Sequence, residues 1–396
     1  YDTDMKVFDI LFRMERNGMT IDLEYMKQYQ AILEEKIEVN KKKTFTDFGG
    51  EGCSFDINSP NEVAEVLYRK MKLPVPKLTG KGGDSTDDEA LRQIDHPVAR
   101  GIQEHRSLSK MLSTYVLPLQ EQAVNGVIHP DFGLTRTRTG RFSCSDPNVQ
   151  NITKDIDLRR AFTVEPGEEM WFWDQSQIEM VGFAMYSKDP KMVEALKRGD
   201  DLHTVTAQEV LGKKEVTKEE RAMGKGTNFA MIYGVGKAKL AKYLSGYVGR
   251  EVTDLEAAIF KGKYLTAFPT VYSFQRLVMN TVQKHREPWG NFVKNKFGRV
   301  RRIDPLKAYT GVNHLIQGWA ADMMKAAMVK IDEKYKPKWR QNIHDCIRID
   351  CEIDIKKEFI KDIADLLTNF PDVGLPIKCT IEHSRTNWAE TEEVKL

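Results

Sequence analysis

The sequence of 396 residues has few cysteines, no long hydrophobic run and a net charge of only +2. The five cysteines contain no Cys-x-x-Cys pair, which argues against a structural zinc site, and their odd number argues against a disulfide framework. No apolar run approaches the roughly 18 residues that a membrane helix needs. No signal peptide is visible, so we expect a reducing, cytoplasmic location without a membrane.

Other signals are also missing. The glycine-rich segment at residues 78–85 lacks the Gly-x-x-x-x-Gly-Lys-Ser/Thr pattern of a phosphate-binding loop, so we interpret it as a mobile loop with a possible contact to a nucleic-acid backbone. The near-zero net charge gives no global indication of a nucleic-acid partner. Basic residues nevertheless gather in residues 284–307, either as a solvated face or as an anion-binding strip.

The length exceeds what one compact core usually holds, so two or three subdomains are expected. Apolar spacing predicts that the first 120 residues are mainly helical, including a helix at about 23–41, one opened by a capping box at 59–62, and one that stops at Pro118. Strands and loops are expected at 127–180 and helices at 190–244. A hairpin at 339–352 and a strand near 377–381 complete an α, β, α, β order.

The most informative segment follows four large apolar residues, 170–173, which predict a strand buried on both faces. Asp174 lies at the exit of this strand, and Glu179 follows near the start of the next helix. A carboxylate held there is costly to bury unless it is paired or bound to a cation. The alternative is a helix-capping Asp followed by a surface Glu.

A second pattern places Arg221, Lys225, Phe229 and Tyr233 at steps of four residues, which puts them on one stripe of a helix. The cations suit phosphate oxygens, and the rings can stack on a base or sugar. His203 lies one helix earlier and could add a donor. The alternative is a mixed surface with two exposed aromatic rings.

Two further sites complete the set. Asp345 projects from a tight turn between apolar segments, and together with Asp174 it could bind a hard divalent cation. Asn313 and Gln317 lie one helical turn apart, a spacing that suits hydrogen bonds to base edges in a minor groove. The same amides could equally satisfy buried backbone groups.

Taken together, these segments resemble family A DNA polymerases. Residues 139–152 (TGRFSCSDPNVQNI) resemble a signature of that family, and residues 174–179 resemble its motif A. Residues 221–234 resemble motif B, and His344-Asp345 resembles motif C. The similarity covers nearly the whole chain in the family's order.

The resemblance implies an α+β right-hand polymerase fold with an antiparallel β-sheet palm, helical fingers and a helical thumb. The expected division is a palm-edge helix at 1–20, thumb at 21–120, palm with motif A at 121–186, fingers at 187–304, and palm with motif C at 305–396. The implied activity is template-directed addition of deoxynucleotides to a primer 3′-hydroxyl by two-metal-ion phosphoryl transfer. The implied partners are primer–template DNA and deoxynucleoside triphosphates, and a monomer is expected.

The resemblance also assigns residue roles. Asp174 and Asp345 would hold two Mg²⁺ ions, for which Mn²⁺ could substitute, and Lys225 would act with them in catalysis. The nucleotide-binding residues would be His203, Arg221, Lys225, Phe229, Tyr233, Gln177 and Glu179, the last as a block to a ribose 2′-hydroxyl. The DNA-binding residues would be Arg141, Asn148, Gln150, Asn151, Asn313, Gln317 and His344.

The chain departs from the family pattern at several positions. Cys346 stands where motif C normally ends in Glu, so activity with altered metal dependence is expected. Gln175, Ala222 and Tyr309 replace an aromatic residue, an Arg and a template-contacting Arg, which suggests a phage or plasmid lineage and, for a phage enzyme, the host cytoplasm. The residues before 139 leave no room for a proofreading exonuclease domain, and the start at Tyr1 suggests a fragment. The competing hypotheses are a single-subunit RNA polymerase-like enzyme and a non-catalytic primer–template binder.

Overall fold

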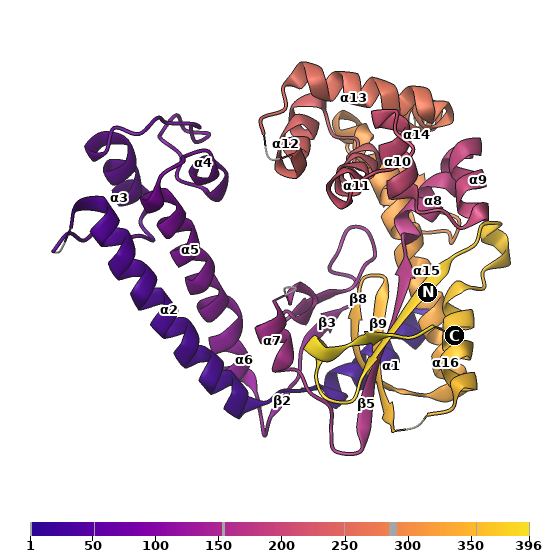
Figure 1. The fold of residues 1–396 in the computed structure, drawn as a ribbon. Coiled ribbons are helices and arrows are strands. Elements are labelled where there is room, and N and C mark those ends of the chain that lie inside the picture. Colours follow the sequence, from indigo (N-terminus) through magenta and orange to yellow (C-terminus); the bar gives the residue numbers. More distant parts are fainter. Residues whose placement is uncertain are drawn as a thin grey trace.

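The computed structural model describes residues 2–50, 52–152, 155–248, 250–284, 291–353 and 355–395. Figure 1 shows a central sheet with one helical group to its left and a second helical group above it. Arg286 of the basic segment lies outside the described residues. Among the helices that the structure describes, none is long and apolar enough to cross a membrane.

The central sheet has five antiparallel strands in the order β11-β10-β5-β9-β8. Their bounds are β5 Glu168–Ser176, β8 Lys338–Ile343, β9 Cys346–Glu352, β10 Lys378–Ser384 and β11 Glu392–Glu393. The predicted hairpin and the predicted strand near residue 379 are therefore confirmed. β5 is the middle strand, and both of its neighbours come from the last 60 residues of the chain, so the sheet depends on long-range pairing.

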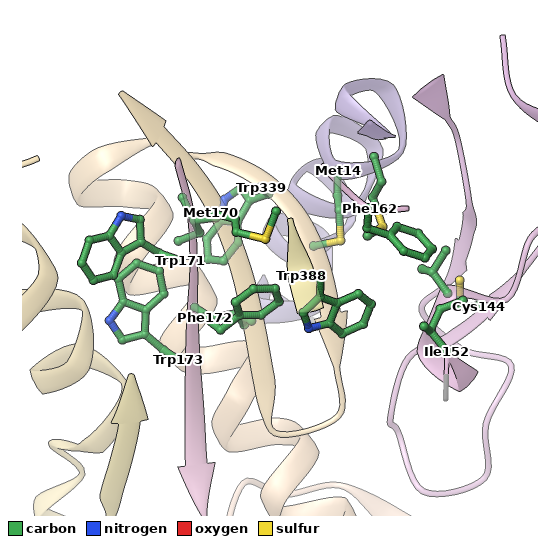
Figure 2. Close-up of a cluster of buried hydrophobic side chains, with 14 of the residues drawn as sticks. Met14, Cys144, Ile152, Phe162, Met170, Trp171, Phe172, Trp173, Trp339 and Trp388 are labelled. Atoms are coloured by element: carbon green, nitrogen blue, oxygen red, sulfur yellow. The ribbon is translucent and has the colours of Figure 1, made fainter. Parts of the chain in front are cut away.

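Aromatic side chains on both faces of β5 form the centre of the largest hydrophobic core. Residues 170–173 of β5 are all buried, which confirms the predicted two-sided burial. Phe172 stacks on Trp388 with ring centroids 5.6 Å apart, and Trp173 donates a hydrogen bond to the carbonyl of Ile360. Figure 2 shows Trp171 and Trp173 on one side of β5 and Phe172 with Trp388 on the other. Helices α1 (Asp2–Asn17), α15 (Gly311–Tyr335) and α16 (Lys357–Thr368) contribute to the same core.

The first helical group contains α2 Leu23–Gly49, α3 Pro60–Ala64, η1 Glu65–Lys70, α4 Asp88–Arg92, α5 Pro97–Met111, η2 Leu112–Val116 and α6 Leu117–Gln122. The mainly helical character of this part is confirmed, but three details were wrong. α2 continues past residue 41. The helix does not stop at Pro118, because α5, η2 and α6 follow one another without a break and the wider π-helical turn η2 immediately precedes this proline. Half of the capping box is missing, since Glu62 accepts from the backbone N of Asp56 instead.

The second helical group contains α8 Ile178–Ser187, α9 Pro190–Arg198, α10 Leu202–Leu211, α11 Lys218–Ile232, α12 Lys237–Val248, α13 Asp254–Ala267 and α14 Pro269–Lys284. The predicted helical region is confirmed and extends 40 residues further than expected. The N-cap of α8 is Gln177 in a left-handed conformation, so Asp174 does not cap this helix, and the capping alternative is wrong.

Short elements connect these parts. β1 Met19–Thr20 pairs with β2 Val127–Ile128, β3 Asp131–Gly133 pairs with β4 Ser143–Ser145, and β6 Phe292–Lys294 pairs with β7 Val300–Arg302. The remaining short helices are η3 Val149–Asn151, α7 Ile156–Arg160, η4 Pro305–Thr310, η5 Pro371–Val373 and η6 Trp388–Glu390. The pairing of β3 with β4 bounds the loop that carries Arg141, and this loop reaches the site described next.

Candidate active site

Two carboxylates meet where β5 and the β8–β9 hairpin lie side by side. Asp174 of β5 is directly opposite Cys346, the first residue of β9. Asp345 precedes Cys346 in the hairpin turn, and its carbonyl accepts a hydrogen bond of 2.9 Å from the backbone N of Gln175. The structure therefore brings together the two acidic residues that the sequence placed 171 positions apart.

The electrostatics of this pair favour a bound cation. Desolvation raises the pKa of Asp345, and the charges of Arg141, His344 and Lys225 oppose the shift only in part. Desolvation raises the pKa of the Cys346 thiol well above its ordinary value, and the neighbouring Asp174 and Asp345 raise it further. The thiol is thus neutral, whereas the carboxylates offer the hard oxygen donors that Mg²⁺ prefers.

The donor set is small. In the described part of the chain, no group of three or more His, Cys, Asp or Glu side chains is arranged to hold a metal ion. A cation at this position would therefore be bound by two carboxylates with its remaining ligands supplied from elsewhere, such as water or substrate phosphates. That pattern is common for Mg²⁺ in phosphoryl-transfer enzymes, so the residues fit this ion.

Next to the carboxylates, Glu179 in the first turn of α8 forms an ion pair with Arg141. Desolvation raises the pKa of Glu179, while Arg141 and Gln317 lower it. Gln317 of α15 also donates a hydrogen bond of 3.2 Å to the hydroxyl of Tyr233. The network connects residues that the sequence assigned separately to the sugar, the DNA and the template.

The cation and aromatic residues of α11 occupy one face, as their spacing predicts. Phe229 stacks on Tyr233 with centroids 5.9 Å apart, and the Lys225 ammonium lies 6.0 Å from the centroid of Phe229. Arg221 and Lys225 are exposed, whereas both rings are half-buried. Arg221 forms two hydrogen bonds, of 2.7 and 3.1 Å, with Asp201. The stripe is therefore accessible, but its first cation already has a carboxylate partner.

His203 lies in the wall behind this stripe. Its ring is 6.0 Å from that of Phe229, and the side chain is only 4% exposed. Burial lowers the pKa of His203 to about 4, so the imidazole is neutral at physiological pH. Its Nδ1 contacts the side-chain amide of Asn228 at 3.1 Å. Direct contact with a ligand would thus use an uncharged ring.

Asn228 is a residue whose role the sequence did not reveal. Its Oδ1 accepts hydrogen bonds from Thr206 and Tyr264, and its Nδ2 contacts His203. It therefore connects α10, α11 and α13. Asp201 was also missed, although its position immediately before a helical segment is a typical signal of an N-cap.

The side chains of Gln175 and Gln177 make hydrogen bonds within the protein. Gln175 is fully buried and donates a hydrogen bond of 2.6 Å to the carbonyl of Leu367 in α16. The side-chain oxygen of Gln177 accepts a hydrogen bond of 3.0 Å from the backbone N of Leu202 at the start of α10. Gln177 thus connects the exit of β5 to the helix that carries His203.

Two of the residues assigned to DNA, Gln150 and His344, lie at the β8–β9 hairpin. Gln150 donates to the carbonyl of Asn342, and the side chain of Asn148 caps η3. Asn151 is exposed and Asn313 is half-buried. His344 is exposed in the turn with a positive φ of 58°, and partial desolvation together with the charge of Arg141 lowers its pKa.

Comparison with known proteins places this site in context. Residues 23–390 match the model of DNA polymerase family A. The chain is 34% identical to DNA polymerase I of Caldicellulosiruptor bescii, covering 97% of this chain and 46% of that protein. It is 33% identical to DNA polymerase I of Aquifex aeolicus, covering 89% of this chain and 60% of that protein. The chain thus spans about half the length of the curated relatives that it matches.

A solved structure agrees with these matches. The polymerase domain of Pol1 from M. smegmatis, in complex with DNA primer-template and dNTP, superposes with a TM-score of 0.88 at 26% identity. The match covers 97% of this chain and 70% of that chain. The expected α+β fold, with a β-sheet palm and helical fingers and thumb, is thereby confirmed.

Proposed function

Because the chain belongs to DNA polymerase family A, we propose that it adds deoxynucleotides to a primer 3′-hydroxyl under the direction of a template. The observation that carries this proposal is the position of two sheet-borne carboxylates, Asp174 and Asp345, beside an accessible stripe of cations and rings on α11. Phosphoryl transfer requires charge neutralisation and positioning at one place, and this arrangement offers both.

Asp174 and Asp345 would hold the divalent cations. When bound, two Mg²⁺ ions would favour deprotonation of the primer 3′-hydroxyl and stabilise the charge on the phosphoryl group in transit. The strand pairing keeps the two carboxylates close together before any ion arrives, which lowers the ordering cost of binding. Because Cys346 would be neutral, the negative charge at the metal position would come from Asp174 and Asp345.

The α11 stripe would bind the incoming nucleotide. Lys225 and Arg221 would contact the triphosphate, and Lys225 is among the cations that lower the pKa of Asp345, so it lies within electrostatic reach of the carboxylates. Phe229 would lie by the sugar and Tyr233 by the templating position. His203 and Gln177 would act from behind by holding the wall of this site. Arg221 would have to break its hydrogen bonds with Asp201 in order to contact a phosphate.

Glu179 and the surrounding amides would distinguish the sugar and hold the duplex. A carboxylate fixed by Arg141 leaves little room for a ribose 2′-hydroxyl. Arg141, Asn313 and Gln317 would follow the minor groove near the primer terminus, where acceptor positions occur on every base pair. Gln150, Asn148, Asn151 and His344 would contact the DNA near the β8–β9 turn.

The subdomain boundaries at 20, 120, 186 and 304 are part of this proposal. A separate hydrophobic cluster between Ile57 and Ile102 supports an independent thumb, and another between Met223 and Ala257 supports the fingers. We also propose that the protein is a monomer and that it acts in the cytoplasm, where DNA and nucleotides occur.

Primer extension tests the proposal. The purified chain, with Mg²⁺ and all four deoxynucleotides, should extend an annealed primer and should discriminate against ribonucleotides. Asp174→Asn should abolish extension while primer–template affinity remains. Asp362→Asn is a control, because Asp362 of α16 pairs at the surface with Lys334 of α15. Loss of this carboxylate should leave extension unchanged.

Two other outcomes would replace the proposal. Efficient use of ribonucleotides by the unmodified chain would identify an RNA polymerase-like enzyme. Tight binding of primer–template without any extension, unaffected by Asp174→Asn, would indicate a non-catalytic binder.

A further inference from the structure

The loop that carries Arg141 is supported from behind by charged residues that the proposed chemistry does not use. Gly140 has a φ of +84°, and a Cβ atom at this position would lie 2.7 Å from Nε and Cζ of Arg299. Arg299 comes from the hairpin β6–β7, far from Gly140 in sequence. The guanidinium therefore lies against the backbone immediately before Arg141.

The same backbone also lies against α15. A Cβ atom on Gly318 would lie 3.3 Å from the carbonyl oxygen of Thr139 and 3.7 Å from Cδ of Arg299. Thr139 thus lies against α15, and Gly140 lies against the Arg299 side chain. Gly318 follows Gln317, so α15 contacts the Arg141 network directly through one residue and supports its loop through the next.

Arg299 is itself held firmly. Its Nη2 donates a hydrogen bond of 2.6 Å to Oδ1 of Asp322, and its Nε donates one of 2.9 Å to Oδ2 of the same carboxylate, which lies on α15 one helical turn after Gly318. Asn295 donates a further bond of 2.7 Å to Asp322, and its Oδ1 accepts from the backbone N of Arg299. A bidentate arginine–carboxylate pair fixes both the position and the plane of the guanidinium.

A second charge pair supports the residue on the other side of Arg141. The Lys325 ammonium lies 5.5 Å from the ring centroid of Phe142 and donates a bond of 3.0 Å to Asp4 of α1. Lys325 is only 2% exposed, and Asp4 also lies 3.9 Å from Arg299. Both neighbours of Arg141 in the chain therefore contact a cation that an acidic residue holds.

Buried charges are costly, and a simple hydrophobic contact would stabilise such a loop as well or better. A charge cluster differs from a hydrophobic contact because its directional bonds define one geometry. We propose that the Arg299–Asp322 pair is a positioning element for Arg141: it fixes the loop so that Arg141 meets both Glu179 and the primer terminus. This inference rests on the proposed function.

A double-mutant cycle tests this role. Asp322→Asn preserves the shape of the side chain but removes its charge, and it should slow single-turnover nucleotide addition by about 10- to 100-fold, because a displacement of about 1 Å at a reacting centre can have effects of this size. In an Arg141→Ala background the same change should have less than about a twofold effect, because the residue that it positions is absent.

The control is Asp332→Asn, on the same helix. Like Asp322, Asp332 pairs with a cation: Arg13 of α1 donates a hydrogen bond of 2.5 Å to it. The side-chain exposure of Asp332, 15%, is close to the 10% of Asp322. A comparable fall in the thermal unfolding midpoint is expected for both variants, but only Asp322→Asn should slow the reaction. If Asp322→Asn does not yield folded protein, Arg299→Lys, which removes the bidentate bond, replaces it in the same cycle.

The outcomes separate the two levels of inference. Equal slowing by Asp322→Asn in both backgrounds, or equal slowing by Asp332→Asn, would show a structural role only and overturn the positioning role while the polymerase activity stands. An unmodified chain that adds no nucleotide would contradict the proposed function itself and, with it, the positioning role.

Discussion

Arg141 and Glu179 form an ion pair that joins the loop after β3 to the first turn of α8. Both side chains are largely shielded from solvent, with exposures of 19% and 9%. An exposed ion pair contributes little stability and is screened by salt. Shielding from solvent avoids both losses and holds these two side chains in one geometry. The proposed sugar gate therefore includes the arginine that orients the carboxylate.

Replacement of the gate residue should admit ribonucleotides. Glu179→Ala removes the side chain that would meet the 2′-hydroxyl, so the ratio of kcat/KM for deoxynucleotides to that for ribonucleotides should fall by about 100-fold. Steady-state kinetics with matched nucleotide pairs measures the ratio. Glu194→Ala, at an exposed position of α9, should leave it unchanged. An unaltered ratio in Glu179→Ala would remove the gate assignment.

Addition of a hydroxyl to the stripe of α11 should change the use of chain terminators. Phe229→Tyr would offer a polar group to the sugar in place of the missing 3′-hydroxyl, so discrimination against dideoxynucleotides should relax by about tenfold, the value of one hydrogen bond. Competition between deoxy and dideoxy substrates in primer extension provides the measurement. Phe260→Tyr on α13, also half-buried, is the control. Equal discrimination against dideoxynucleotides by both variants would contradict the proposed position of Phe229 beside the sugar.

The buried His203 should make stability depend on pH. Its pKa falls to about 4 in the folded protein from an ordinary value of 6.5, so the unfolded chain binds more protons between these limits. Stability from this residue is therefore fully present above pH 6.5 and is lost as the pH falls toward 4, by up to about 3 kcal/mol. Denaturant unfolding at several pH values should show a smaller loss for His203→Gln. The same pH slope in both proteins would exclude this source.

A carboxylate at position 346 should alter the response to Mg²⁺. Cys346→Glu adds a negative charge directly opposite Asp174, so the Mg²⁺ concentration that gives half-maximal extension should fall by about tenfold. Cys346→Gln has a similar size without the charge and should show no such fall. If the two variants respond alike, the thiol does not set the metal dependence.

The sequence predicted best those features that depend on local patterns. The apolar run of β5, the β8–β9 hairpin and the α11 stripe each follow from spacing and residue type, and the structure confirms them. The full length of α2 and helix α13 were missed because their amphipathic patterns are weak. Helix α14 was missed although its buried residues Val271, Phe274, Val278 and Val282 recur at helical spacing. Pro118 was misinterpreted because a π-helical turn, η2, precedes it and the helix continues through the proline.

The contacts between distant segments could not be predicted from the pattern. Arg221 has an aspartate partner 20 residues earlier, and Gln177 caps a helix 25 residues away. Neither pairing leaves a signal in spacing, because each depends on how α8, α10 and α11 pack. The Arg299–Asp322 pair is similar: basic residues were visible in that segment, but their partners were not.

Helix α1 has a consequence for how a minimal catalytic fragment should be chosen. The family match begins at residue 23, whereas α1 ends at Asn17 and so lies entirely before it. Its side chains Val7, Ile10, Leu11 and Met14 are nevertheless buried in the core beneath the sheet, and Asp4 reaches the loop of Arg141 through Lys325. A fragment trimmed to residues 23–390 would therefore lose part of the core beneath the sheet. The core that supports this site therefore extends upstream of the residues that the family model matches.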